Sequence, residues 1–157
     1  MSKSELELES ELELSKHYRA LERMYLAGPI DQFYQSKITI SEAHSEIVID
    51  VKKEFFHGAG AVHGSVYFKL LDDAAFFASN SLEKEVFVLT TSFTTYITRP
   101  ISSGKMKAIG KVVNKNRSQF IAESIVYDDK GREVGRGNGI FVRSKIKLAS
   151  VDGYLNS

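Results

Sequence analysis

Apolar residues recur at helical spacing near the start of the chain. From Leu14 onward they lie three or four positions apart on one stripe, and the leucines and glutamates around them are good helix formers. Gly28 and Pro29 then interrupt the pattern, as is usual where a helix ends. The spacing therefore predicts a helix from about Ser4 to Leu26.

Apolar and polar side chains then alternate in residues 36–41 and 45–56, which is the pattern of half-buried strands. Further segments, separated by turn-forming residues, are rich in β-branched and aromatic side chains. These segments span residues 85–100, 104–113, 119–127 and 132–143. We expect the last four strands to form an antiparallel meander that extends the sheet begun by the first two.

Between the two groups of strands lies a stretch that is apolar on nearly every side. Residues 65–81 are too long and too dense in apolar residues for a strand, so they are predicted to form a helix. A helix that is apolar all round is buried on all sides. We therefore expect the sheet to wrap around this helix, with the help of a second subunit.

One α+β domain over residues 1–157 follows from this order of elements. It comprises an N-terminal helical segment (1–30), a core (37–143) in which about six antiparallel strands wrap a long central helix, and a C-terminal tail (144–157). Gly135, Gly137 and Gly139 share one face of the last strand. They indicate either close approach of another backbone or a flexible edge strand.

Composition narrows the functional classes. Lys plus Arg number 21 and Asp plus Glu number 20, so no strong field attracts the chain to nucleic acid or to acidic lipid. The chain has no cysteine, which excludes disulfides, thiolate metal sites and a cysteine nucleophile. Neither a secretory signal nor a membrane-spanning stretch is evident. We expect a soluble cytoplasmic protein that binds neither nucleic acid nor membrane.

Two adjacent aspartates, Asp72 and Asp73, stand in the middle of the apolar helix. About 100° separates them around the helix axis, so they have different environments. A carboxylate in an apolar setting has a raised pKa unless it is paired or hydrogen-bonded. Either aspartate could cap a loop or pair with a lysine at a subunit contact, but Asp72 could also be a base at a subunit interface.

Gly64 and Ser65 stand at the predicted start of the same helix, where the first backbone N–H groups have no partner within the helix. Such donors can hold a carbonyl oxygen that gains negative charge. Asp72 is about two turns further along, so it would need a facing subunit to act together with them. A carboxylate and oxyanion donors are the minimum for hydrolysis of an acyl bond.

These residues resemble those of a known family, the hotdog-fold thioesterases of the phenylacetic-acid-degradation type. The resemblance covers roughly residues 37–143, and the order of helix and strands agrees with it. It is carried by His63-Gly64-Ser65, Phe68, Leu70, Asp72, Ala74, Ala78 and Asn80-Ser81, and by the segments TTSFTTYITRPI, GKMKAIGKVVNKNRSQF and VYDDKGREVGRGNGIFV.

The resemblance implies the hotdog fold, dimers joined edge to edge into one sheet, often tetramers, and active sites between subunits. It implies that Asp72 acts as general base or nucleophile on an acyl-CoA thioester, with no metal or other cofactor. The Ser65 N–H takes the oxyanion position, together with Gly64. Thr90 falls where relatives have a serine or threonine that orients the attacking water.

Two positions depart from the family pattern. Ser65 replaces the second glycine of His-Gly-Gly, which keeps the backbone donor but adds a side chain. His57 replaces an asparagine that contacts the thioester or the water in relatives, and an imidazole could donate the same hydrogen bond or titrate near neutrality. A loop histidine facing solvent is the other interpretation. His63 is interpreted mainly as packing the loop against the helix, beside the substrate.

Basic residues near turns, Arg99, Lys115 and Arg117, are candidates to bind the CoA phosphates, although a turn needs polar residues in any case. With Asp73 and His63 they complete the substrate-binding candidates.

The leading function is an acyl-CoA thioesterase. A non-catalytic acyl-CoA-binding protein is the alternative, and a hydratase or dehydratase is disfavoured because the helix has no glutamate and Phe77 stands five residues after Asp72.

Overall fold

Six antiparallel strands form one curved sheet around a central helix, as the sequence predicts. The computed structural model describes residues 2–155, and the strand order is β1-β2-β4-β5-β6-β3. The helices are α1 (Lys3–Ala27), α2 (Pro29–Tyr34) and α3 (Gly64–Asn80), with short 3-10 turns at Lys53–Phe55 and Leu148–Ser150. The strands are β1 (Lys37–Ser41), β2 (His44–Asp50), β3 (Val86–Ile97), β4 (Lys105–Lys115), β5 (Gln119–Asp128) and β6 (Glu133–Lys147).

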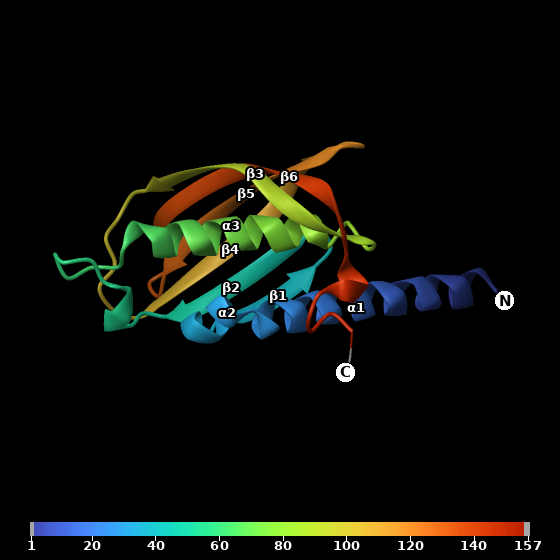
Figure 1. Ribbon diagram of the computed structural model, residues 1–157, viewed down its shortest axis with the longest axis horizontal. Coiled ribbons are helices and arrows are strands. Elements are labelled where there is room, and N and C mark those ends of the chain that lie inside the picture. Colours follow the sequence, from blue (N-terminus) through green and yellow to red (C-terminus); the bar gives the residue numbers. More distant parts are fainter. Residues whose placement is uncertain (1, 156–157) are drawn as a thin grey trace.

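The position of β3 corrects the expected meander of four strands. β3 pairs with β6 at the far edge of the sheet, whereas β4 pairs with β2 and β5. The connection between β3 and β4 is not a hairpin, because Thr98 N–H bonds to Val134 O, Val62 N–H to Ile101 O and Val51 N–H to Gly104 O. It therefore crosses the N-terminal end of α3, from one side of the sheet to the other (Figure 1).

Small residues in three neighbouring strands let α3 lie close to the sheet. Gly110 of β4 pairs with Ser45 of β2 and with Ser124 of β5. A Cβ atom on Gly110 would lie 2.2 Å from Ala74 O, so the helix backbone rests directly on this glycine. The Ser45 hydroxyl donates to Ala74 O at 2.6 Å and the Ser124 hydroxyl to Leu71 O at 2.7 Å. Both hydroxyls are thereby satisfied under the helix.

The three alternating glycines of β6 confirm one of the two expectations, the close approach of another backbone. β6 lies between β5 and β3, so it is not an edge strand. Cβ atoms on Gly137 and Gly139 would each lie 2.5 Å from the ring of Phe93, which therefore occupies the space above them. The ring of Phe93 also packs against Phe68 of α3 at a centroid distance of 5.7 Å. Cβ atoms on Gly137 and Gly139 would also lie 2.6 Å from the carbonyl oxygens of Thr94 and Ser92, so the glycines make room for the backbone of β3 as well as for an aromatic ring.

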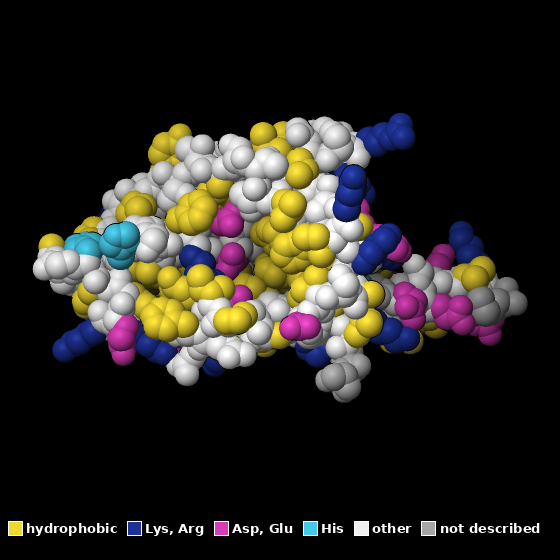
Figure 2. Space-filling view, viewed as in Figure 1, with side chains coloured by type: hydrophobic (Ala, Val, Ile, Leu, Met, Phe, Trp, Pro, Cys, Tyr) yellow, Lys and Arg dark blue, Asp and Glu magenta, His cyan; other side chains and the backbone are white. Residues whose placement is uncertain are grey.

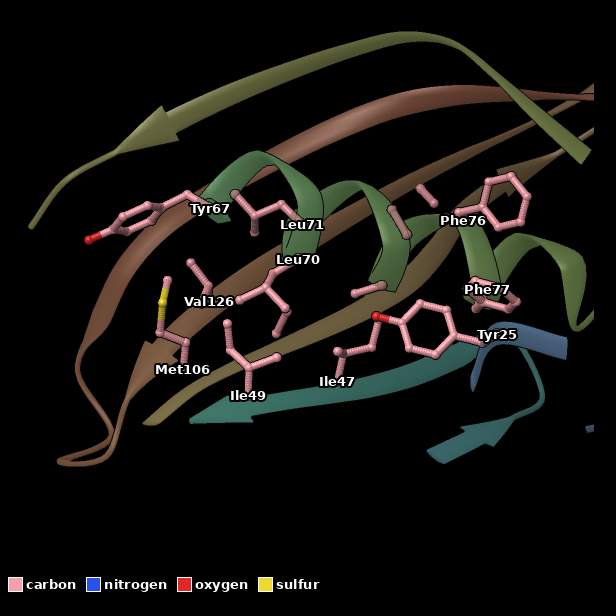
Figure 3. Close-up of a cluster of buried hydrophobic side chains, with 14 of the residues drawn as sticks. Tyr25, Ile47, Ile49, Tyr67, Leu70, Leu71, Phe76, Phe77, Met106 and Val126 are labelled. Atoms are coloured by element: carbon pink, nitrogen blue, oxygen red, sulfur yellow. The ribbon is translucent and has the colours of Figure 1, made fainter. Parts of the chain in front are cut away.

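The core lies between the concave face of the sheet and α3. Figure 3 shows large side chains of α3 directed towards Ile47, Ile49, Met106 and Val126 of the sheet, with Tyr25 of α1 reaching in from the side. One side of α3 remains open, however. Phe68 is 43% exposed and Asp72 and Asp73 are half-buried, so α3 is not buried on all sides within one chain.

The segments at the two chain ends pack together on the edge beside β1. α1 matches the predicted helix, and its first half projects beyond the body (Figure 1). α2, which the sequence did not predict, begins at Pro29 directly after α1. β6 runs past residue 143, and the following segment contacts α1, where Tyr154 Oη lies 2.8 Å from His17 Nδ1. No helix in residues 2–155 has the length and apolar character needed to cross a membrane.

Candidate active site

Asp72 and Thr90 meet where α3 passes β3. The Thr90 hydroxyl donates a hydrogen bond to Asp72 Oδ1 at 3.0 Å, and both side chains are half-buried. The pairing of β3 with β6 shifts register between Thr90 and Ser92, which marks a β-bulge. Bulges re-aim side chains next to functional sites, and here Thr90 is directed at the carboxylate.

The environment of Asp72 raises the pKa of its carboxyl group. Burial raises the pKa of Asp72 to about 6, and the charge of Asp73 acts in the same direction. The hydrogen bond from Thr90 and the charge of Lys69 lower the pKa and oppose the effect of burial. A carboxylate with a pKa near 6 is ionised at neutral pH, yet it is a stronger base than an exposed aspartate.

A cavity of about 430 Å³ opens beside this carboxylate. Its apolar wall consists of side chains from α3 and β3, and α1 and α2 close the opposite side. The apolar wall includes Phe76, Phe77, Phe87 and Leu89. Figure 2 shows acidic and basic side chains within a hollow that is bordered by hydrophobic ones. Water is scarce against such a wall, which strengthens electrostatic interactions inside the cavity.

Asp73 is not hydrogen-bonded to Thr90 but paired with a lysine, and this lysine belongs to the same helix rather than to a subunit contact. Lys69 Nζ lies 2.5 Å from Asp73 Oδ2 and 2.5 Å from Asp31 Oδ1 of α2. Lys69 and Asp31 are buried, and both line the same cavity as Asp72. Burial raises the pKa of Asp73, while the pairing with Lys69 opposes that shift.

Lys69 and Asp31 are the site residues that the sequence did not reveal. The spacing of Lys69 and Asp73 by four residues on one helix was a signal for their pairing. Asp31 gave no comparable signal, because it lies 38 residues before Lys69 and in a helix that was not predicted.

The start of α3 has one used and one free backbone donor. His63 is the N-cap residue, and its Nδ1 accepts a hydrogen bond from Ser65 N–H at 3.0 Å. His63 therefore caps the helix, and its place beside the substrate stays a prediction. Gly64 N–H has no hydrogen-bond partner among residues 2–155. The free donor at this helix start is thus that of Gly64, and the Ser65 N–H becomes available only if His63 releases it.

A second cavity, of about 310 Å³, lies at this end of α3 and brings Gly64 together with His57 and Arg99. His57 is exposed, and its Nδ1 accepts a hydrogen bond from Ala59 N–H at 3.1 Å. The backbone at Arg99 is fixed because the Tyr67 hydroxyl donates to Arg99 O at 2.7 Å. The histidine and the arginine thus line one cavity with the helix start, and their roles at the thioester and at the CoA phosphates stay predictions.

The two halves of the predicted site are not together in one protomer. Gly64 precedes Asp72 by eight residues, which is about 12 Å along the helix axis, and the two residues line different cavities. Lys115 and Arg117 are exposed at the turn between β4 and β5 and line neither of these cavities. In residues 2–155, no group of three or more His, Asp or Glu side chains is arranged to hold a metal ion.

Comparison with known proteins agrees with this architecture. The family model of the thioesterase superfamily matches residues 59–135, which include α3, Asp72 and Thr90. None of the curated proteins matches the sequence. Among solved structures, the PaaI protein from the phenylacetic acid degradation operon of E. coli is 18% identical, with a TM-score of 0.78 over 85% of this chain and 96% of that chain.

A thioesterase family protein from Silicibacter pomeroyi is 20% identical, with a TM-score of 0.71 over 78% of this chain and 96% of that chain. At such identities the structural likeness establishes the fold, and the family match establishes the relationship. The α+β architecture and the helix-wrapping sheet are those that the sequence predicts. The chain is therefore a hotdog-fold member of the thioesterase superfamily.

Proposed function

We propose that the protein is an acyl-CoA thioesterase that uses Asp72 as its general base or nucleophile. The observation that carries this proposal is a half-buried carboxylate with a pKa near 6, hydrogen-bonded to Thr90 beside an apolar cavity. Apolar cavities with a few convergent polar groups and a perturbed pKa are typical of active sites. The family match supports a thioesterase-type reaction.

In the proposed mechanism, Asp72 takes a proton from a water molecule that attacks the thioester carbonyl, or attacks it directly. The Thr90 hydroxyl holds one carboxylate oxygen, which leaves the other free to act. The Gly64 N–H, at the positive end of the α3 dipole, binds the carbonyl oxygen as it gains charge. The carbon–sulfur bond then breaks, and CoA leaves as its thiolate, which takes up a proton. Where Asp72 has attacked directly, water then hydrolyses the anhydride between Asp72 and the acyl group, which releases the acid and restores the carboxylate.

We infer that each active site combines two protomers. α1 covers the β1 edge of the sheet, whereas the outer edge of β3 has no partner strand among the described residues. The side chain of Asn80 binds Val86 O and Val88 N at the start of β3, and the edge beyond them is a template for pairing with another chain. Two β3 strands paired across a two-fold axis would bring the α3 start of one protomer towards Asp72 of the other.

Hydrolysis of a panel of short, long and aromatic acyl-CoAs, followed with a thiol reagent, tests the reaction. Asp72→Asn should lower kcat/KM by at least about a hundredfold, since a positioned base contributes that much. Asp50→Asn, the same change at an exposed aspartate outside the cavity, is the control. Absence of CoA release by the wild type would refute the enzyme, and full activity of Asp72→Asn would refute the assignment of the base.

Mixing two inactive variants tests the shared site. Gly64→Pro removes the free N–H at the first position of α3, where proline is well tolerated. In a mixed dimer with Asp72→Asn, one site would combine an intact Asp72 with an intact Gly64. Random mixing should therefore restore about a quarter of the wild-type activity. If both groups came from the same protomer, mixing would restore nothing.

A non-catalytic acyl-CoA-binding protein is the second candidate. The observation that favours it is the cap at His63, which occupies the Ser65 N–H and leaves one free donor at the helix start. A single donor stabilises an oxyanion less than two do. Saturable binding of acyl-CoA without CoA release would favour this alternative over the enzyme.

A further inference from the structure

The cavity beside Asp72 has a charged wall as well as an apolar one. This wall consists of Asp31, Lys69 and Asp73, which come from α2 and α3. The side chains of Lys69 and Asp31 are 10% and 9% exposed, and that of Asp73 is 21% exposed. Because these residues line the same cavity as Asp72 and Thr90, one ligand can contact both groups.

All hydrogen-bond donors of this wall are used within the protein. Lys69 Nζ donates to Asp31 Oδ1 and Asp73 Oδ2, and it lies 3.3 Å from the Tyr25 hydroxyl, which in turn donates to Ser36. An ammonium group has three donors, so none remains for a ligand. The Thr90 hydroxyl is also used, since it donates to Asp72.

The wall nevertheless keeps acceptors and an excess of negative charge. Each carboxylate has one oxygen bonded to Lys69, and its second oxygen can accept further hydrogen bonds. Two carboxylates around one ammonium group leave one negative charge, and Asp72 adds another. A ligand that brings a further negative charge into such a cavity is strongly disfavoured. A ligand with a cationic donor can instead donate hydrogen bonds to the second oxygens of the carboxylates.

We propose that Asp31 and Asp73, held in place by Lys69, select the acyl group by charge. The wall favours acyl groups that carry a protonated amino group and rejects those that carry a second carboxylate. This inference rests on the proposed function, because it takes the cavity beside Asp72 as the acyl site. Lys69 is a positioning residue here: it orients both carboxylates and offers the ligand nothing itself.

Three CoA thioesters of matched size test the selection: 4-methylbenzoyl-CoA, 4-(aminomethyl)benzoyl-CoA and 4-carboxybenzoyl-CoA. In the wild type, kcat/KM for the aminomethyl substrate should exceed that for the carboxy substrate by at least about tenfold. Asp31→Asn and Asp73→Asn keep the shape and remove one charge each, so each should reduce this ratio by about tenfold. Asp50→Asn should leave the ratio at its wild-type value.

Non-hydrolysable thioether analogues of the three ligands, titrated by calorimetry, separate this inference from the reaction itself. If no thioester is hydrolysed but Kd follows the same order, the proposed activity fails and the charge selection holds. If hydrolysis occurs with equal preference, or if neither variant shifts the ratio, the selection is overturned while the activity stands. Failure of every analogue to bind would overturn both. Thermal unfolding shows which variants are folded. If only one of Asp31→Asn and Asp73→Asn folds, that variant alone is enough for the test.

Discussion

Asp72 is under opposing influences whose balance sets its chemistry. Burial raises its pKa to about 6, while Thr90 and Lys69 favour the ionised form and limit the rise. The sequence predicted a perturbed carboxylate because the helix around it is apolar. It did not predict that Lys69 moderates the effect, because the sequence analysis assigned no role to this lysine.

The raised pKa predicts how activity depends on pH. Only ionised Asp72 can act as a base or nucleophile, so kcat/KM for an acyl-CoA should fall below a pH of about 6 and be level above it. Thr90→Val removes the hydrogen bond that lowers the pKa of Asp72, so the midpoint should move to higher pH. Steady-state rates between pH 4.5 and 8.5 measure the midpoints of the wild type and of Thr90→Val. A midpoint at lower pH in Thr90→Val than in the wild type would contradict this account.

The same residue should make the protein less stable at neutral pH. The pKa of Asp72 in the folded chain lies above that of an unfolded aspartate, so folding takes up a proton between the two values. The stability contributed by this group therefore falls as pH rises from about 4 to about 6. Asp72→Asn should raise the free energy of unfolding by about 1–3 kcal/mol at pH 7.5 and change it much less at pH 4. Urea titrations of the wild type and of Asp72→Asn at the two pH values measure these changes in the free energy of unfolding. Equal changes at both pH values would contradict the prediction.

At the scale of the elements, periodicity was enough to predict α1, α3 and the six strands, but it predicted neither α2 nor which strands are neighbours. α1, α3 and all six strands have the spacing that their environments require. The pairing of β3 with β6 was missed, because alternating side chains indicate that a strand is half-buried and not which strand lies beside it. The contact from α2 to α3 through Asp31 and Lys69 was missed because α2 itself was not predicted.

The contact between α3 and the sheet should tolerate no side chain at Gly110. Gly110→Ala places a methyl group against Ala74 O, where a Cβ would lie at 2.2 Å, so the helix must move. Overpacking of this kind costs about 1–3 kcal/mol of stability. Gly58→Ala is a suitable control, because nothing lies within 4 Å of its Cβ position. Denaturant unfolding of both variants measures the difference, and equal stability would show that α3 can adjust.

At the scale of the whole molecule, the outer edge of β3 determines how protomers can combine. The carbonyls of Ser92 and Thr94 lie close to Gly139 and Gly137 of β6. In an antiparallel pair, the N–H and C=O groups of one residue point to the same side of the strand. Ser92 and Thr94 direct these groups towards β6, so the residues that alternate with them, including Thr95, direct their N–H and C=O groups outward. The hydroxyl of Thr95, by contrast, is buried without a partner among the described residues.

We expect a dimer in sedimentation velocity, and Thr95→Pro should dissociate it. Proline removes one outward N–H from β3 and is tolerated at an edge strand, so the protomer should still fold. Thr95→Val keeps the N–H and should remain dimeric. Thioesterase activity should be lost together with the dimer, because the proposed site needs both protomers. An active monomeric Thr95→Pro would contradict the shared site.

The pairing of β3 with β6 also bears on how the protein is made. β3 comes near the middle of the chain, but the residue opposite Thr90 in the sheet is Phe141. On the ribosome, β3 therefore has no strand of its own chain to pair with until the residues up to Phe141 have emerged. Subunits should consequently assemble after synthesis rather than between nascent chains, and a message truncated before Phe141 would yield neither a docked β3 nor a finished site.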